Sequence, residues 1–261
     1  MATSGKRTHD DGSAGDADYG RIGAGYTDFR RPDPRIAAAI RSALGPARSV
    51  LNVGAGAGSY EPTDLDVTAV EPSASMRALR PVGRPAIDAT ADSLPFPDDS
   101  FDAAMSTFSV HQWPDLAKGL AEVRRVTRGP IVIMSVDPEF DGHFWLSDYA
   151  PEVMETESGR YPTIAGIAAA LGGVTEVQTV PIPLDCTDGF NQAYYGRPEL
   201  LLEEGARKAN SAWSFVAPEV PERFVRDLSA DLASGAWDAK YAALRNLPTW
   251  DGGLRLVVGR P

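Results

Sequence analysis

VLNVGAGAG, residues 50–58, is the stretch from which the rest of the chain can be understood. Its first half is a short aliphatic run, which predicts a buried strand. Glycines at 54, 56 and 58 follow directly, and residues without a Cβ allow a tight loop whose backbone N–H groups approach a ligand closely. The stretch therefore predicts a strand, a glycine-rich turn and a helix, an arrangement that serves a dinucleotide, a phosphate or another nucleotide.

Three features near this loop narrow the class of nucleotide. Ser59 stands where a dinucleotide-binding loop carries its third glycine, and no lysine follows, which excludes a Walker-type phosphate loop. Glu71 comes at the end of the next predicted strand, 67–70, where a carboxylate can accept hydrogen bonds from both hydroxyls of a ribose. These residues leave NAD and S-adenosylmethionine open as ligands.

Predicted strands and helices alternate along the first two thirds of the chain. We expect strands at 50–53, 67–70, 86–88, 101–106 and 130–136, with helices at 35–44, 74–79 and 115–127. This alternation predicts βαβ units and a parallel sheet with helices on both faces. The pattern then becomes less regular, with helices at 152–158 and 163–171, a strand at 175–182, a mixed helical region at 190–247 and a last strand at 254–258.

The segment TADSLPFPDDSFD (90–102), followed by a buried strand and HQWPD (111–115), decides between the two cofactors. In this order, after the glycine loop and Glu71, it resembles the class I S-adenosylmethionine-dependent methyltransferases, and more narrowly the small-molecule "type 11" group. The resemblance runs from 50 to 136. The segments FWLSDYAPE (144–152), CTDGF (186–190) and SGAWD (234–238) resemble a bacterial subgroup of methyltransferases and extend the likeness without adding a substrate.

The resemblance implies an α/β fold of the Rossmann-like kind, a doubly wound, seven-stranded and mostly parallel sheet with a helical lid and an insertion. We expect a disordered tail at 1–17 and a single methyltransferase domain at 18–261. Within that domain we expect an N-terminal lid at 18–34, a nucleotide-binding core at 35–185, a helical cap insertion at 186–250 and a last strand at 251–261.

The resemblance also implies a site for S-adenosylmethionine, with the glycine loop under the methionine moiety, Glu71 on the ribose and Met76 against the adenine. The residues expected to bind this cofactor are Asn52, Gly54, Ala55, Gly56, Glu71, Pro72, Met76, Thr90, Ala91, Asp92, Thr107 and Phe108. Two of them depart from the family's pattern, because Asn52 and Thr90 stand where the family usually has Asp. We interpret Asn52 as a tolerated variant rather than a loss of donor binding.

Methyl transfer is an in-line displacement, in which an enzyme orients the nucleophile and removes its proton. His111 follows a central predicted strand and is the candidate general base, with packing beside Trp113 as the alternative. The residues expected to bind the acceptor are Tyr19, Tyr26, Trp113, Asp137, His143, Trp145, Tyr149 and Tyr194. Their aromatic character favours a small, partly apolar or aromatic metabolite of specialised metabolism, although many of these rings also suit core packing.

Composition limits the partners and the location. The net charge of −11 disfavours a nucleic-acid partner, and no apolar run is long enough for a membrane-spanning helix. Cys186 is the single cysteine, which excludes an intramolecular disulfide and favours a reducing, cytoplasmic compartment. We assign no metal ligands, and a homodimer stays open.

Two other functions remain compatible with these residues. In one, the fold binds the cofactor but promotes a reaction without methyl transfer, such as a cyclisation. In the other, the chain is a non-catalytic scaffold partner, which the change at Asn52 would favour. An NAD enzyme is a more distant alternative.

Overall fold

The computed structural model describes residues 10, 15, 17–18 and 25–261, so Tyr19 and most of the predicted tail lie outside the described residues. In this part of the chain, seven strands form the main sheet. They are β1 (Ser49–Val53), β2 (Asp66–Val70), β3 (Ala86–Ile87), β4 (Ala103–Thr107), β5 (Ile131–Val136), β6 (Val174–Thr179) and β9 (Leu254–Arg260).

The order of the strands across the sheet is β3-β2-β1-β4-β5-β9-β6. The first five strands pair in parallel, whereas β9 runs antiparallel to both β5 and β6. The predicted seven-stranded, mostly parallel sheet is therefore confirmed. The chain order reverses between β1 and β4, and ligands of such open sheets bind at the carboxyl ends of the strands beside this point.

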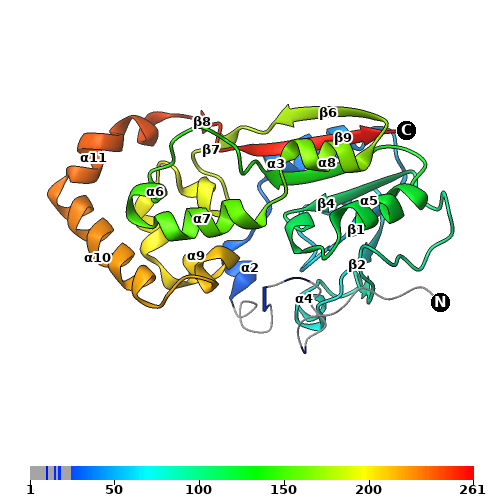
Figure 1. The fold of residues 1–261 in the computed structure, drawn as a ribbon, viewed down its shortest axis with the longest axis horizontal. Helices are drawn as coiled ribbons and strands as arrows, with labels where there is room; N and C mark the ends of the chain where they lie inside the picture. Colours follow the sequence, from blue (N-terminus) through cyan, green and yellow to red (C-terminus); the bar gives the residue numbers. More distant parts are fainter. Residues whose placement is uncertain (1–9, 11–14, 16, 19–24) are drawn as a thin grey trace.

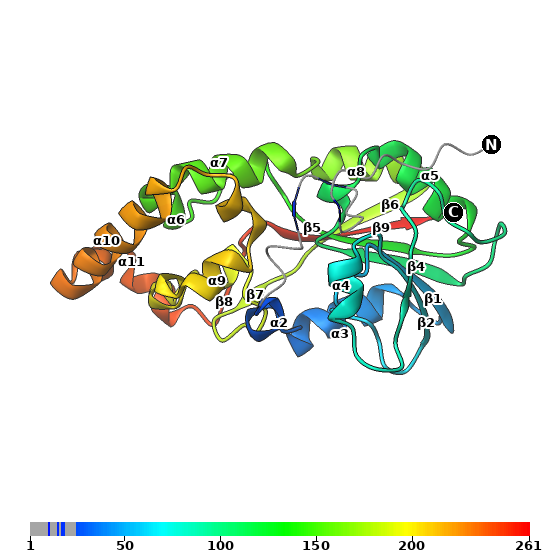
Figure 2. The same ribbon diagram turned by 90° about the horizontal axis from the view of Figure 1, so that it is seen from below.

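Helices cover both faces of the sheet (Figure 2). On one face, α3 (Pro34–Ala43) buries Ile36 and Ile40 against the sheet. On the other face, α5 (Leu116–Arg125) and α8 (Ile164–Leu171) pack together over the alternate strand residues, whose side chains point to that face. All residues of β5 are buried, as expected of a central parallel strand covered on both sides.

A lobe of short helices, here called the cap, extends beyond one end of the sheet (Figure 1). Its helices are α6 (Leu146–Tyr149), α7 (Pro151–Arg160), α9 (Glu204–Lys208), α10 (Glu219–Ser234) and α11 (Ala236–Tyr241). Short 3-10 turns also belong to the cap, namely η2 (Asn191–Tyr194), η3 (Pro198–Leu202), η4 (Ser211–Ser214) and η5 (Ala242–Asn246). The cap thus combines the predicted insertion with α6 and α7, from a segment that the sequence assigns to the core.

The predicted strand at 175–182 divides into two elements. The first, β6, belongs to the main sheet, whereas β7 (Ile182–Pro183) pairs with β8 (Thr249–Trp250) in a separate two-stranded sheet at the base of the cap. Pro181 lies between them and has no N–H for a sheet hydrogen bond, so the strand ends there.

The described part of the predicted lid contains α2 (Tyr26–Phe29), which lies between the sheet and the cap in Figure 2. It is fixed to the cap because Gly189 N donates to Phe29 O at 2.9 Å and Arg30 pairs with Asp188 as an isolated bridge. Two further short elements, α4 (Ala74–Ala78) and η1 (Val110–Gln112), follow β2 and β4. No helix among the described residues has the length and hydropathy needed to cross a membrane.

Candidate functional site

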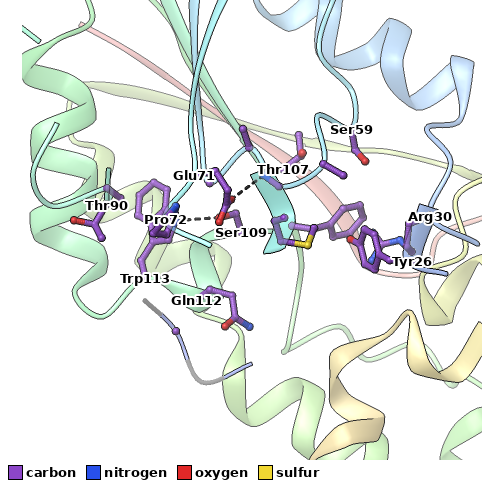
Figure 3. Close-up of a pocket in the computed structure, with 18 of the residues that line it drawn as sticks. Tyr26, Arg30, Ser59, Glu71, Pro72, Thr90, Thr107, Ser109, Gln112 and Trp113 are labelled. Atoms are coloured by element: carbon purple, nitrogen blue, oxygen red, sulfur yellow. Dashed lines mark hydrogen bonds between the residues drawn. The ribbon is translucent and has the colours of Figure 1, made fainter. Parts of the chain in front are cut away.

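A cleft of about 850 Å³ lies at the carboxyl ends of β1, β2 and β4, and we call it the donor cleft. Its lining includes every residue predicted to bind the cofactor except Asn52 and Asp92. Figure 3 shows Thr90 and Trp113 at one end of the cleft and Tyr26 and Arg30 at the other, with Glu71 between them. The cleft therefore brings the glycine loop, the acidic residue and the 90–92 loop together, as the sequence predicts.

The glycine loop allows close backbone approach. Gly54 has a φ of 66°, and a Cβ built on it would lie 1.8 Å from Ser109 Oγ. Gly56 has a φ of 51°, and its N–H donates to Glu71 Oε2 at 2.8 Å. Both positions thus require glycine for conformation, and Gly54 also requires it for space.

We expect Gly54→Ala to destabilise the protein more than Gly45→Ala does. Gly45 also has a positive φ, but a Cβ there would meet no atom within 4 Å, so this control isolates the backbone strain. The free energy of unfolding from chemical denaturation should fall by about 1–2 kcal/mol more for Gly54→Ala because of crowding at Ser109. Equal losses of the free energy of unfolding for the two variants would show that Ser109 does not crowd a side chain at position 54.

Glu71 lies at the end of β2 and is only 7% exposed. Its Oε1 accepts from Ser73 N and its Oε2 accepts from Gly56 N, each at 2.8 Å. Burial raises the pKa of the Glu71 carboxyl, while these two backbone donors favour the ionised form. The carboxylate is thus held rigidly, and each oxygen keeps a further acceptor position for a ligand.

Asn52 does not line the donor cleft, which corrects the prediction of a direct cofactor contact. Its Nδ2 donates to Glu61 Oε1 at 3.0 Å, and Arg80 Nη2 donates to both Glu61 oxygens at 2.8 and 2.9 Å. Arg80 Nη1 also donates to Gly56 O at 3.2 Å. Asparagine suits this position because it can donate to Glu61, whereas an aspartate would place two carboxylates together.

Asp92 also lies outside the lining of the donor cleft. Its Oδ2 lies 3.2 Å from Lys118 Nζ, which links the 90–92 loop to α5. Trp113 was predicted to bind the acceptor, but it lines the donor cleft, where its Nε1 donates to Ser109 Oγ at 3.1 Å. Trp113 is therefore placed to contact the donor and to hold Ser109 beside the glycine loop.

A second hollow of about 530 Å³, here called the acceptor cavity, adjoins the donor cleft. The two share Tyr26, Arg30 and Phe108. Phe108 has a φ of 50°, a conformation that is strained for an aromatic residue and typical of functional sites. His111 lines the acceptor cavity and stacks on Tyr161 with 4.2 Å between ring centroids.

Arg30 lies where the donor cleft meets the acceptor cavity and is not among the residues predicted from sequence. Its Nε donates to Asp188 Oδ1 at 2.5 Å, and its guanidinium carbon lies 5.1 Å from the centroid of the Phe108 ring. Burial alone would lower the pKa of Arg30, but the Asp188 carboxylate holds it above its usual value. No sequence signal connects Arg30 with Asp188 of the CTDGF segment, because the two residues lie 158 positions apart in the chain.

A third hollow of about 590 Å³, the apolar extension, continues from the acceptor cavity on the side away from the donor cleft. The two hollows share Val136, Glu157, Tyr161 and Gln192, whereas the extension shares no lining residue with the donor cleft among the described residues. Phe140, Phe144, Met154 and Trp250 form one apolar wall, for which the hollow is named. Polar side chains form the rest of the lining, among them Ser147, Ser158 and the predicted acceptor residue Asp137. The three hollows therefore lie in series.

Comparison with known proteins shows the family to which this chain belongs. The model of a family described as "Methyltransferase domain" matches residues 51–130. A crystal structure from Anabaena variabilis ATCC 29413, described as a candidate methyltransferase from an antibiotic biosynthesis pathway, is 30% identical, with a TM-score of 0.84 over 88% of this chain and 98% of that one. The chain belongs to the class I S-adenosylmethionine-dependent methyltransferases, in the type 11 group.

Curated relatives match over shorter segments. The "Uncharacterized methyltransferase YcgJ" of Bacillus subtilis is 35% identical over 116 residues, which are 40% of this chain and 42% of that protein. The "Demethylmenaquinone methyltransferase" of Renibacterium salmoninarum is 38% identical over 97 residues, 34% of this chain and 41% of that protein. The chain thus spans about two fifths of the length of these relatives.

Membership in this family can be tested on the donor cleft itself. A sulfonium nucleoside needs a backbone cradle, a ribose acceptor and an apolar adenine face, and the cleft offers the glycine loop, Glu71 and Met76. A Cβ at Gly54 would fill the cradle. The described residues contain no group of His, Cys, Asp and Glu arranged to hold a metal ion. The residues present therefore fit S-adenosylmethionine.

His143 and Trp145, which the sequence predicts to bind the acceptor, line none of the three hollows. His143 is exposed, with its Nε2 3.2 Å from Asp148 Oδ1. Trp145 is fully buried between α6 and the helices that carry Phe224 and Trp237. The prediction is wrong for both residues, because His143 is exposed to solvent whereas Trp145 packs into the core of the cap.

Tyr149 and Tyr194 also lie outside the three hollows, which corrects their predicted role. The hydroxyl of Tyr149 donates to Asp231 Oδ2 at 2.7 Å and thereby links α6 to α10. Tyr194 is buried in the cap core. Of the predicted acceptor residues that the structure describes, Tyr26 and Asp137 line the acceptor cavity and the apolar extension, respectively.

We expect His143→Ala to leave donor affinity unchanged and to alter the free energy of unfolding by at most about 0.5 kcal/mol. The reason is that His143 is an exposed surface residue, whose ion pair with Asp148 is weak in water. Calorimetric titration with S-adenosylhomocysteine and denaturation of the variant check both values. A strong loss of donor affinity would show that His143 contributes to the donor cleft.

Proposed function

We propose that this protein transfers a methyl group from S-adenosylmethionine to a small molecule by in-line displacement. One observation carries the proposal: the donor cleft and the acceptor cavity meet at Tyr26, Arg30 and Phe108. An in-line reaction needs the nucleophile and the leaving sulfur on opposite sides of the methyl carbon. Two hollows joined at one narrow boundary suit that requirement.

The lining of the donor cleft suggests how the donor would bind. The ribose hydroxyls would donate to Glu71, whose oxygens already accept from Ser73 and Gly56. The adenine would lie toward Thr90 and Trp113, and the methionine end toward Arg30, the cationic residue of the lining. S-adenosylmethionine supplies a methyl carbon made electrophilic by its sulfonium, while the chain binds, orients and excludes water.

The acceptor cavity supports a small-molecule substrate. It lies between the lid and the cap, and its lining combines polar side chains with the rings of Phe108, Tyr161 and Phe190. The Arg30–Asp188 ion pair joins the end of α2 to the cap at this cavity, which suits a small molecule better than a polymer. His111 is the candidate general base, because it lines this cavity and follows β4 directly.

Two further proposals concern the biological setting. The relative from Anabaena variabilis is described as part of an antibiotic biosynthesis pathway, which supports a role in specialised metabolism. The acidic net charge of −11 supports a substrate other than nucleic acid. The single cysteine, Cys186, supports a reducing, cytoplasmic location.

Isotope transfer tests the proposed function. The protein would be incubated with donor carrying a CD₃ group and a small-molecule extract, and products would be read by mass spectrometry. We expect S-adenosylhomocysteine and CD₃-labelled product in equal amounts. A new product without label would favour the cyclisation-type alternative, and donor binding without any product from extracts of several sources would favour the scaffold.

A further inference from the structure

Glu157 is a buried carboxylate at the centre of the proposed acceptor region. It lies on α7, is 8% exposed, and lines both the acceptor cavity and the apolar extension. The donor cleft does not include it. No residue pattern in the sequence marks it, because the groups that contact it are far away in the chain.

Two amide side chains from η2 hold this carboxylate in place. Asn191 Nδ2 donates to Glu157 Oε2 at 2.6 Å, and Gln192 Nε2 donates to Oε1 at 2.8 Å. Trp213 Nε1 donates to Asn191 Oδ1 at 3.1 Å, which fixes the orientation of that amide. Asn191 and Gln192 are neutral amides, so they fix the position of both carboxyl oxygens and favour the ionised form without supplying a counter-charge.

Gln192 adds a second acceptor beside the first. It is 4% exposed, lines the same two hollows, and its Oε1 has no hydrogen-bond partner among the described residues. An acceptor buried without a donor costs free energy, and so does a buried charge without a counter-charge. Both costs are removed by a ligand group that carries a positive charge and several N–H donors.

The two arginines of the acceptor cavity, Arg30 and Arg160, contact other partners. Arg30 is ion-paired with Asp188. Arg160 donates to Ser211 Oγ at 3.0 Å and lies over the ring of Phe215. The two arginines lower the pKa of Glu157 at longer range, but burial is the larger effect and raises it. Neither arginine takes the place of a cation at the carboxylate.

We infer that Glu157 and Gln192 bind a protonated amino group of the acceptor, an inference that rests on the proposed function. An ammonium has no lone pair, so this group anchors the acceptor and a different atom of the same molecule receives the methyl group. The apolar part of the acceptor would lie against Phe140, Phe144 and Trp250 in the extension. The substrate class is thus a small apolar amine with a second, nucleophilic group.

Matched probes test this inference on the full chain with S-adenosylhomocysteine bound. The probes are 3-phenylpropylamine and 3-phenylpropanol, which share a skeleton but differ in charge, and their affinities are measured by ligand-observed NMR titration. We expect the amine to bind about 10-fold more tightly than the alcohol, the usual scale for a buried charge pair. In Glu157→Gln this preference should fall to less than about 2-fold.

Glu152→Gln is the control, because Glu152 lies on the same helix but is half-exposed and paired with Arg223. It should keep the full preference for the amine. Equal binding of amine and alcohol to the wild-type protein overturns the inference even if Glu157→Gln fails to fold. Binding of S-adenosylhomocysteine is measured first, so its absence would contradict the proposed function instead.

Discussion

Glu71→Ala is expected to weaken binding of S-adenosylhomocysteine by about 100-fold, close to 3 kcal/mol, the scale of two hydrogen bonds to a charged acceptor. The physical reason is that the Glu71 carboxyl is buried and already fixed by Gly56 N and Ser73 N. The substitution removes the ribose acceptor and also frees the Gly56 N–H. Isothermal titration calorimetry of the variant measures the loss.

Asp66→Ala is the control for this substitution, because Asp66 lies at the exposed start of the same strand. It should bind the donor as the wild-type protein does. A Glu71→Ala variant that keeps wild-type affinity would show that the ribose lies elsewhere and would remove the chemical basis for assigning the donor cleft.

Arg80→Met is expected to lower the free energy of unfolding by about 3–5 kcal/mol, the usual cost of leaving a buried charge without its partner. Both side chains of the Arg80–Glu61 pair are 2% exposed. Among the described residues, Asn52 is then the one side chain that still donates to the Glu61 carboxylate. Urea denaturation followed by circular dichroism measures the change.

Arg84→Met provides the comparison, since Arg84 is an exposed residue on the same connection. Its free energy of unfolding should stay within about 0.5 kcal/mol of the wild-type value. The double variant Glu61→Gln with Arg80→Met should recover part of the loss, because it removes the uncompensated charge. A small loss for Arg80→Met alone would mean that water reaches Glu61.

The fold and the donor cleft could be predicted because their signals are local. The strands β1, β2 and β5 carry short aliphatic runs, and most donor residues follow directly after β1, β2 and β4. Parallel strands bring these segments to one edge of the sheet without further information. Two residues are exceptions: Asn52 depends on Glu61 and Arg80, and Asp92 pairs with Lys118, and no motif connects these partners.

The acceptor region could not be predicted in the same way, because distant segments form it. Glu157 meets Asn191 and Gln192, which lie more than 30 residues later in the chain, and Arg30 meets Asp188 across an even longer separation. Aromatic side chains outside the nucleotide core were a poor guide. Rings such as Trp145 fill the core of the cap, since a lobe of short helices needs large side chains to bury.

The central claim is that the donor cleft binds S-adenosylmethionine, and titration of the purified protein with S-adenosylhomocysteine tests it most directly. We predict one site per chain with a dissociation constant in the micromolar range, about −8 kcal/mol. Absence of binding at millimolar concentrations of both S-adenosylhomocysteine and S-adenosylmethionine would contradict the account.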